Sequence, residues 1–326
     1  MSERSAYRVH AGLDEAGYGP LLGPLTIGFS AFRSETPVDW KHLAEAVSDA
    51  PSDDRERLVV ADSKRVFTRN PRGARRLETT ALAFLRAAGS PGVRAADVLA
   101  SAPETLRPAA DIHTTHPWYD ALPSSLPIHV DGETLAARES DLAATLTKTA
   151  TEVVAAGVVV VPAGTLNASF DATNNKGATL WSYHSGVILD LFERFGDEGL
   201  ELCCDRLGGR ARYGRGLSEL VPFSTVRVLG ESREDSRYEV TSGTRRMRIR
   251  FVQKGDVRSL PTALGSCLAK YARELVMGAF NEHFAGLCPG VRPTAGYVTD
   301  ARRWLADVEE ARPEALPARR CLVRTR

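Results

Sequence analysis

Hydrophobic and polar positions change their spacing several times along the chain, and each spacing predicts a type of element. Alternating or continuous apolar runs before glycine-rich turns are typical of strands, whereas apolar positions three or four apart are typical of helices. The predicted strands are residues 8–14, 26–32, 157–161 and 200–205, and the predicted helices are residues 75–88, about 135–156 and 176–195. Strands with acidic ends that alternate with helices predict an α/β layered fold.

The pattern from residue 222 onward predicts a hairpin followed by a long helix. Residues 222–254 alternate and carry many charges, as in a solvated hairpin. Asp256 then precedes an apolar helical stripe, for which Ser259 is a suitable N-cap and Pro261 suits the first turn. We therefore expect one domain over residues 1–326.

Two segments look like additions to this domain. Gly89 and six prolines interrupt residues 89 to about 130, which predicts an insertion or lid rather than core. We place this insertion at about 89–150 and a hairpin insertion at about 210–252.

Four acidic residues stand out by position. Asp14 and Glu15 close the first strand, Asp205 ends a later strand, and Asp256 follows a lysine-glycine pair. Carboxylates at strand ends supply the oxygen ligands that Mg²⁺ or Mn²⁺ prefers. Successive side chains of a strand point to opposite faces, so the first two share a site only if the strand ends there and the chain turns. Taken singly, such acids are more often solvated turn residues.

Several segments resemble ribonuclease HII. Residues 11–24 are similar to the family's Gly-x-Asp-Glu-Ala-Gly-x-Gly-Pro opening, and the remaining matches follow in the family's order. These matches are Asp62-Ser63-Lys64, residues 173–180, Lys254-Gly255-Asp256 with residues 266–270, and Gly296-Tyr297 with Thr299. The opening and the Lys-Gly-Asp segments are the specific ones.

The resemblance implies a ribonuclease H-like fold, with a mixed sheet flanked by helices. It also implies an endonuclease that hydrolyses the RNA strand of RNA–DNA hybrids by a two-metal mechanism and leaves 5′-phosphomonoesters. Asp14, Glu15, Asp205 and Asp256 would bind two Mg²⁺ or Mn²⁺ ions. The implied substrate contacts are Gly17, Tyr18 and Gly19 near the 2′-hydroxyl, Lys64 at a phosphate and Tyr297 at a sugar or base.

The third carboxylate has two candidates. The family shows Val-Asp-Gly there, whereas this chain has Cys204-Asp205-Arg206 at the end of a strand. Val130-Asp131-Gly132 matches the letters, but it precedes the segment that it should follow. We prefer Asp205 and keep Asp131 as the alternative.

Composition narrows the function less than these motifs do. The net charge is only +1, so a nucleic acid would have to bind at local basic patches. Five cysteines without CxxC spacing favour neither a disulfide framework nor a zinc site. We expect a cytoplasmic monomer that makes no membrane contact.

Two alternatives stay open. This chain has Gly17-Tyr18-Gly19 where the family has Gly-Arg-Gly, and it is longer than typical members. Both departures motivate a non-catalytic nucleic-acid-binding protein that keeps the fold, or a nuclease for structured DNA.

Overall fold

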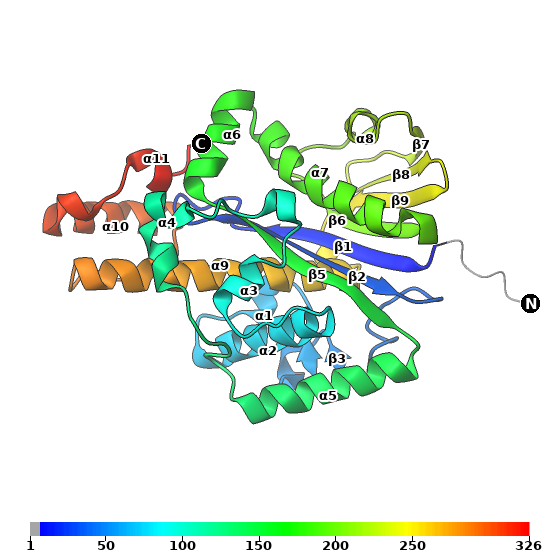
Figure 1. The fold of residues 1–326 in the computed structure, drawn as a ribbon, viewed down its shortest axis with the longest axis horizontal. Coiled ribbons are helices and arrows are strands. Elements are labelled where there is room, and N and C mark those ends of the chain that lie inside the picture. Colours follow the sequence, from blue (N-terminus) through cyan, green and yellow to red (C-terminus); the bar gives the residue numbers. More distant parts are fainter. Residues whose placement is uncertain (1–6, 326) are drawn as a thin grey trace, which may run out of the picture.

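A seven-stranded mixed sheet lies at the centre of the computed structural model, which describes residues 7–325 (Figure 1). Its strands are β1 (Val9–Ala16), β2 (Leu25–Arg33), β5 (Glu152–Val161), β6 (Leu200–Asp205), β7 (Thr225–Gly230), β8 (Asp235–Ser242) and β9 (Arg245–Val252). The order is β5-β2-β1-β6-β9-β8-β7. β6 runs parallel to both β1 and β9, and the other neighbours are antiparallel. The short strands β3 (Val47–Ser48) and β4 (Leu58–Val59) pair separately.

Helices cover both faces of this sheet. They are α1 (Ser63–Val66), α2 (Pro71–Ala87), α3 (Ala95–Leu99), α4 (Ile112–Thr115), α5 (Gly132–Lys148), α6 (Ala163–Thr173), α7 (Lys176–Phe195), α8 (Gly214–Leu220), α9 (Leu260–Leu287), α10 (Val298–Ala311) and α11 (Arg319–Leu322). α9 packs against β1 and β2 on one face, and α7 lies on the other (Figure 1). The predicted α/β fold, a mixed sheet flanked by helices, is confirmed.

The long helix α9 approaches the sheet unusually closely. A Cβ atom on Gly12 of β1 would lie 2.0 Å from the backbone nitrogen of Thr262, so only glycine fits there. Thr26 of β2 also donates a hydrogen bond from its hydroxyl to the carbonyl of Ala269, at 2.8 Å. These contacts fix α9 against the strand that carries Asp14.

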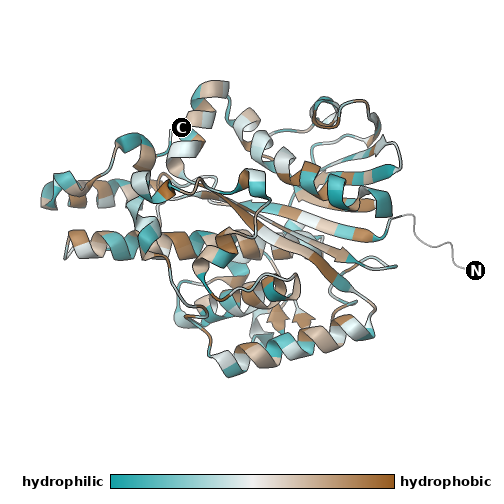
Figure 2. Ribbon diagram, in the orientation of Figure 1, coloured by the Kyte–Doolittle hydropathy of each residue, from teal (hydrophilic) through white to brown (hydrophobic). Residues whose placement is uncertain are grey.

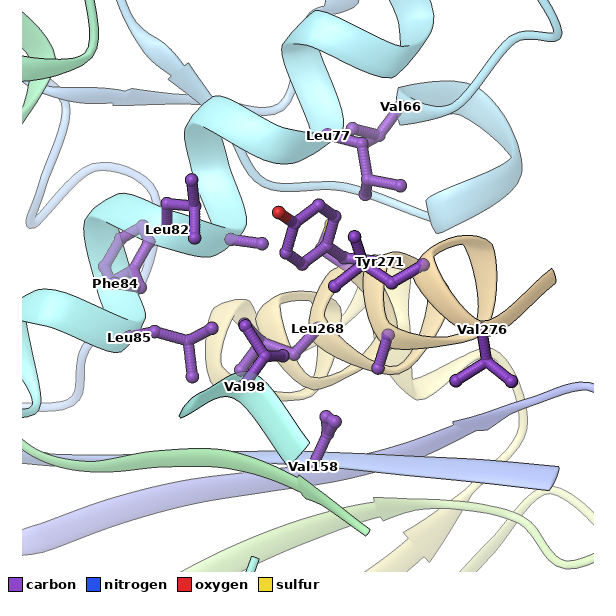
Figure 3. Close-up of a cluster of buried hydrophobic side chains, with 14 of the residues drawn as sticks. Val66, Leu77, Leu82, Phe84, Leu85, Val98, Val158, Leu268, Tyr271 and Val276 are labelled. Atoms are coloured by element: carbon purple, nitrogen blue, oxygen red, sulfur yellow. The ribbon is translucent and has the colours of Figure 1, made fainter. Parts of the chain in front are cut away.

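The hydrophobic core consists of two clusters, one on each side of the sheet. Figure 2 shows hydrophobic stretches along the central strands. The cluster between α2, α9 and the sheet includes Leu77 and Tyr271 near α2 and Leu268 and Val158 nearer the sheet (Figure 3). Burial of such side chains is the main favourable contribution to folding. Within residues 7–325, none of the helices combines the length and the apolar character that a membrane crossing needs.

The segment from residue 89 to 150 contributes to this core. The ring of Trp118 lies 5.1 Å from that of Phe280, centre to centre, and Val98 and Leu142 are buried. The prediction that the proline-rich part lies outside the core is therefore wrong. Proline prevents long helices and strands, but it does not prevent a short segment from burying its side chains.

The boundary between a helix and a strand near residue 150 also differs from the prediction. The helix predicted over about 135–156 ends at Lys148, and β5 already begins at Glu152. Residues 152–157 alternate between exposed or half-buried and buried positions, which is the period of a strand. The helix over 176–195 and the Ser259 cap of α9 are confirmed.

The region around the predicted hairpin insertion holds three strands, β7 to β9, preceded by α8. β9 pairs in parallel with β6, so this region extends the main sheet. The insertion boundaries at 89–150 and 210–252 stay predictions.

Candidate active site

Two of the predicted acids occupy the carboxyl ends of neighbouring parallel strands. Leu13 of β1 is paired with Cys204 of β6, so Asp14 and Asp205 are the next positions along the two strands. Both follow side chains that face the α7 side, Leu13 and Cys204, and Ser266 of α9 lies close enough to Asp14 to affect its pKa. The parallel register therefore places these two carboxylates side by side on the α9 face of the sheet.

Asp256 is held next to Asp205 through the backbone. Asp256 lies in the short 3₁₀ helix η5 (Gly255–Val257) that follows β9. The backbone N–H of Gly255 donates to Oδ1 of Asp205 at 2.8 Å. Asp205 also interacts electrostatically with Asp256. The Lys254-Gly255-Asp256 motif thus brings its carboxylate to the end of β6.

Glu15 lies on the opposite face of the sheet. β1 continues to Ala16, so the chain does not turn after Asp14, as the prediction of a shared site required. The Glu15 carboxylate instead points toward α7, where its Oε2 lies 3.2 Å from Nε2 of His184. It still interacts electrostatically with Asp14 and Asp205. The expectation of a strand end was wrong, yet Glu15 belongs to the same group of charges.

His184 is a buried partner of Glu15 that the sequence reasoning missed. Its Nδ1 lies 3.0 Å from the carbonyl oxygen of Leu180. A carbonyl only accepts, so Nδ1 donates this hydrogen bond, and Nε2 donates to the Glu15 carboxylate when it too carries a proton. The available signal was a histidine on the buried stripe of α7, in register with Leu180 and Val187.

Burial and mutual repulsion dominate the electrostatics of these acids. Burial, with Glu15 and Asp205 nearby, raises the pKa of Asp14 well above its ordinary value. Burial also raises the pKa of Asp205 to about 6. The hydrogen bond from the N–H of Gly255 lowers this pKa, whereas the charges of Glu15 and Asp256 raise it further. Burial and the neighbouring Asp62 raise the pKa of Asp256. A cation between these groups would stabilise their ionised forms.

Asp62 is a fifth carboxylate beside the group, and the sequence analysis gave it no role. It caps α1 by accepting from the N–H of Lys64 at 2.9 Å. The next residue, Ser63, accepts a hydrogen bond at 3.1 Å from Ser266, which also contacts Asp14. The signal for Asp62 in the sequence was the Asp62-Ser63-Lys64 triplet, which resembles a ribonuclease HII segment. Lys64 itself is exposed and interacts electrostatically with Asp256.

The loop after β1 is held in a conformation that needs glycine. Gly17 has φ +83°, and a Cβ there would lie 2.6 Å from the carbonyl oxygen of Pro24. The buried guanidinium of Arg273 donates to the carbonyls of Pro24, at 2.8 Å, and Leu22, at 3.2 Å. This clamp leaves Tyr18 44% exposed, and the Cβ position of Gly19 faces open space.

Tyr297 lies beside this loop. The carbonyl of Gly296 accepts hydrogen bonds from the N–H groups of Leu21 and Leu22, at 2.7 and 3.1 Å. The Tyr297 ring is 50% exposed, and the guanidinium of Arg69 lies 5.9 Å from its centre. The ring is therefore accessible to a ligand.

Asp131, the alternative third carboxylate, has a structural role. It is exposed and caps α5, accepting from the backbone N–H and the hydroxyl of Thr134 at 2.7 and 2.8 Å. These hydrogen bonds lower the pKa of Asp131. The structure brings Asp205 to Asp14, and it assigns Asp131 to the start of a helix.

The donor chemistry of the carboxylate group fits a hard divalent cation, since every side-chain donor is an oxygen. As the side chains stand, residues 7–325 contain no group of three or more His, Cys, Asp or Glu that could hold a metal ion. One reason is that Glu15 lies on the opposite face of the sheet from Asp14 and Asp205.

In sequence, the chain matches no protein-family model and no curated protein. The chain is similar in structure to ribonucleases HII and HIII. The match to ribonuclease HII of Archaeoglobus fulgidus, from its complex with PCNA, has 16% identity and a TM-score of 0.45 and covers 98% of this chain and 94% of that one.

Two further matches are of the same kind. Bst-RNase HIII in complex with Mn²⁺ has 13% identity and a TM-score of 0.42, with 98% of this chain and 67% of that one covered. Ribonuclease H2 of Pyrococcus horikoshii OT3 has 12% identity and a TM-score of 0.39, with 96% and 92% covered. Because the TM-scores stay below 0.5, we infer function from the residues of this chain.

Proposed function

We propose that the protein is a metal-dependent endonuclease that hydrolyses the RNA strand of RNA–DNA hybrids. One observation carries the proposal: carboxylates from β1, β6 and η5, distant along the chain, form one interacting group. Buried like charges are costly, and a purely structural role would leave that cost without compensation. A cation-binding site for phosphodiester chemistry provides the compensation.

Asp14, Glu15, Asp205 and Asp256 would hold two Mg²⁺ or Mn²⁺ ions. When bound, such ions activate the attacking water and offset the charge on the reacting phosphate and the leaving oxygen. The chain's own groups orient the ligands: the N–H of Gly255 fixes Asp205, and His184 fixes Glu15. Lys64, exposed beside Asp256, would contact a phosphate.

The loop after β1 and Tyr297 would read the hybrid. RNA differs from DNA in its 2′-hydroxyl, which a rigid backbone can recognise by hydrogen bonds. Arg273 holds the loop at Leu22 and Pro24, and Arg324 holds it at Gly17. Tyr18 and Tyr297 expose rings that could stack on a sugar or base. The product of this hydrolysis would end in a 5′-phosphomonoester.

A cleavage panel with matched aspartate variants tests the proposal. The substrates are an RNA–DNA hybrid, a duplex with one ribonucleotide, plain DNA and junction DNA, each with Mg²⁺ or Mn²⁺. We expect the wild type to cut the hybrid. Asp205→Asn should lower the rate by more than the roughly 10–100-fold that loss of an outer hydrogen-bond partner costs.

Asp131→Asn is the control, because that aspartate caps a helix outside the site, and it should cut at the wild-type rate. Unchanged cleavage by Asp205→Asn would refute the site. Hybrid binding without cleavage, or cleavage of junction DNA alone, would replace the proposed activity with one of the two alternatives.

A further inference from the structure

A pocket of about 330 Å³ lies directly behind the loop that follows β1. Its walls come from five parts of the chain: this loop, the start of β2, α6, the start of α7 and residues 324–325. The lining residues are Tyr18, Gly19, Pro20, Leu25, Leu166, Phe170, Lys176, Thr179, Leu180, Arg324 and Thr325. We call it the tail pocket. Its volume lies at the lower end of the range of small-molecule sites.

The C-terminal wall of this pocket is built by specific hydrogen bonds. The buried side chain of Asn167 donates to the carbonyls of Arg320 and Val323, at 2.7 and 2.8 Å, and accepts from the N–H of Thr325 at 2.7 Å. The N–H of Arg324 donates to the carbonyl of Leu21 at 3.0 Å. All the hydrogen-bonding groups of one buried amide thus hold the tail in place.

The tail also reaches the loop of the candidate active site. The guanidinium of Arg324 donates to the carbonyl of Gly17, two residues after Glu15. On the opposite wall, Leu180 both lines the pocket and accepts the hydrogen bond from His184, which holds Glu15. The tail pocket is therefore joined to the carboxylate group through two of its walls.

The charges of the pocket complement an anion. Lys176 and Arg324 line it, and no aspartate or glutamate among residues 7–325 does. Lys176 and Thr179 lie in the first turn of α7, where the positive end of the helix dipole adds to this field. The remaining wall is apolar and aromatic, with Leu166 and Phe170 from α6. An aromatic wall beside two cations suits a planar base joined to a phosphate.

We propose that the tail pocket binds one unpaired nucleotide of the nucleic acid, with its base against Leu166 and Phe170 and its phosphate at Lys176 and Arg324. A base stacked within a duplex cannot enter such a pocket, so this nucleotide must be flipped out or belong to a single-stranded flank. The inference rests on the proposed function for its substrate, and it adds that an unpaired nucleotide next to the cut strengthens binding.

Mononucleotide binding tests this inference without any cleavage. Adenosine 5′-monophosphate, adenosine and inorganic phosphate are titrated calorimetrically into the metal-free full chain. We expect the monophosphate to bind at least about tenfold more tightly than either part alone, because base and phosphate contacts act together. Equal affinity for inorganic phosphate and the monophosphate would overturn the proposal.

Variants assign the binding to the pocket. Lys176→Gln should weaken monophosphate binding about tenfold, as expected for loss of a charged contact, whereas the exposed Lys41→Gln should not. Leu166→Trp should fill the pocket and abolish binding. Wild-type affinity in both pocket variants would contradict the assignment.

Asp205→Asn separates this inference from the nuclease proposal. It should lose hybrid cleavage and keep the affinity for the monophosphate, because Asp205 does not line the pocket. Loss of monophosphate binding in Asp205→Asn would place the nucleotide at the carboxylates and overturn the tail pocket. Failure of the wild type to cut a hybrid would instead overturn the nuclease proposal alone.

Discussion

Glu78 and Asp14 are both buried carboxylates that contact α9, yet their surroundings differ. Glu78 of α2 is fully buried and accepts hydrogen bonds from the backbone N–H groups of residues 128–130 and from the hydroxyl of Tyr271. Asp14 accepts from the N–H of Glu15 at 2.8 Å and contacts Ser266, but two further carboxylates interact with it. Donors surround the first group, whereas acids surround the second.

This difference shows which buried acid needs something that the chain does not supply. Hydrogen bonds from several donors compensate the desolvation of Glu78, so it connects α2, α9 and the segment 128–130 as a structural element. The acids at the ends of β1 and β6 have too few donors for their number. Burial of a carboxylate alone therefore does not indicate a functional site. Burial of several carboxylates close together at strand ends does indicate one.

Removing Glu78 should have the largest effect and should fall on stability. Glu78→Ala leaves three backbone N–H groups and the Tyr271 hydroxyl without their acceptor, and each unsatisfied group costs about 1–3 kcal/mol. We expect a loss of at least about 3 kcal/mol in the free energy of unfolding. Urea denaturation measures it, with the exposed Glu309→Ala as the control. If Glu78→Ala loses no more stability than Glu309→Ala, Glu78 does not have the proposed structural role.

Removing His184 should affect the reaction more than its substrate affinity. His184→Ala frees the Glu15 carboxylate from its partner, and loss of such an outer hydrogen bond costs about 10–100-fold. We expect that reduction in kcat for hybrid cleavage with little change in KM, and partial recovery in His184→Gln, which keeps a donor. Steady-state kinetics on both variants decide; wild-type kcat in His184→Ala would contradict a positioning role.

Neutralising Asp14 should stabilise the metal-free protein, opposite in sign to the Glu78 variant. Burial and the neighbouring Glu15 and Asp205 raise the pKa of Asp14, so they disfavour its ionised form in the folded protein. Asp14→Asn should relieve about 1 kcal/mol and raise the Tm by about 2 °C. Calorimetry in the presence of a chelator measures this shift. A lower Tm than that of the exposed Asp120→Asn would show that Asp14 is structural, like Glu78.

Lys64 should give the smallest effect. It is exposed, so its charge is screened by solvent and contributes little to folding. Lys64→Gln should raise KM for the hybrid several-fold, more at low salt than at high salt, and leave the Tm unchanged. Kinetics at two ionic strengths provide the check, and a KM that does not respond to salt would argue against a phosphate contact.

The sequence predicted those parts of the fold that depend on local pattern. The strands over 8–14 and 200–205 and the helix over 176–195 follow from period and apolar content, and the structure contains them. The start of β5 escaped prediction because its alanines and valines also suit the end of a helix. Trp118 was misplaced because prolines indicate irregular backbone and carry no information about burial.

The candidate site was predictable only as far as motifs reach. Asp14, Asp205 and Asp256 were named from strand ends and from the resemblance, and the parallel pairing of β6 with both β1 and β9 brings them together. The separation of Glu15 onto the α7 face depends on how far β1 continues, which is a property of the whole sheet. His184 depends on a contact between distant residues, which no local pattern records.

Binding of Mn²⁺ to the full chain tests the central claim most directly. Titration followed by electron paramagnetic resonance counts the bound ions in the wild type, Asp205→Asn and Asp131→Asn. We expect two ions in the wild type and in Asp131→Asn, and at least about tenfold weaker binding in Asp205→Asn, because a charged ligand is lost. If the wild type binds no Mn²⁺, or if Asp205→Asn binds it as the wild type does, the carboxylate group is not a metal site.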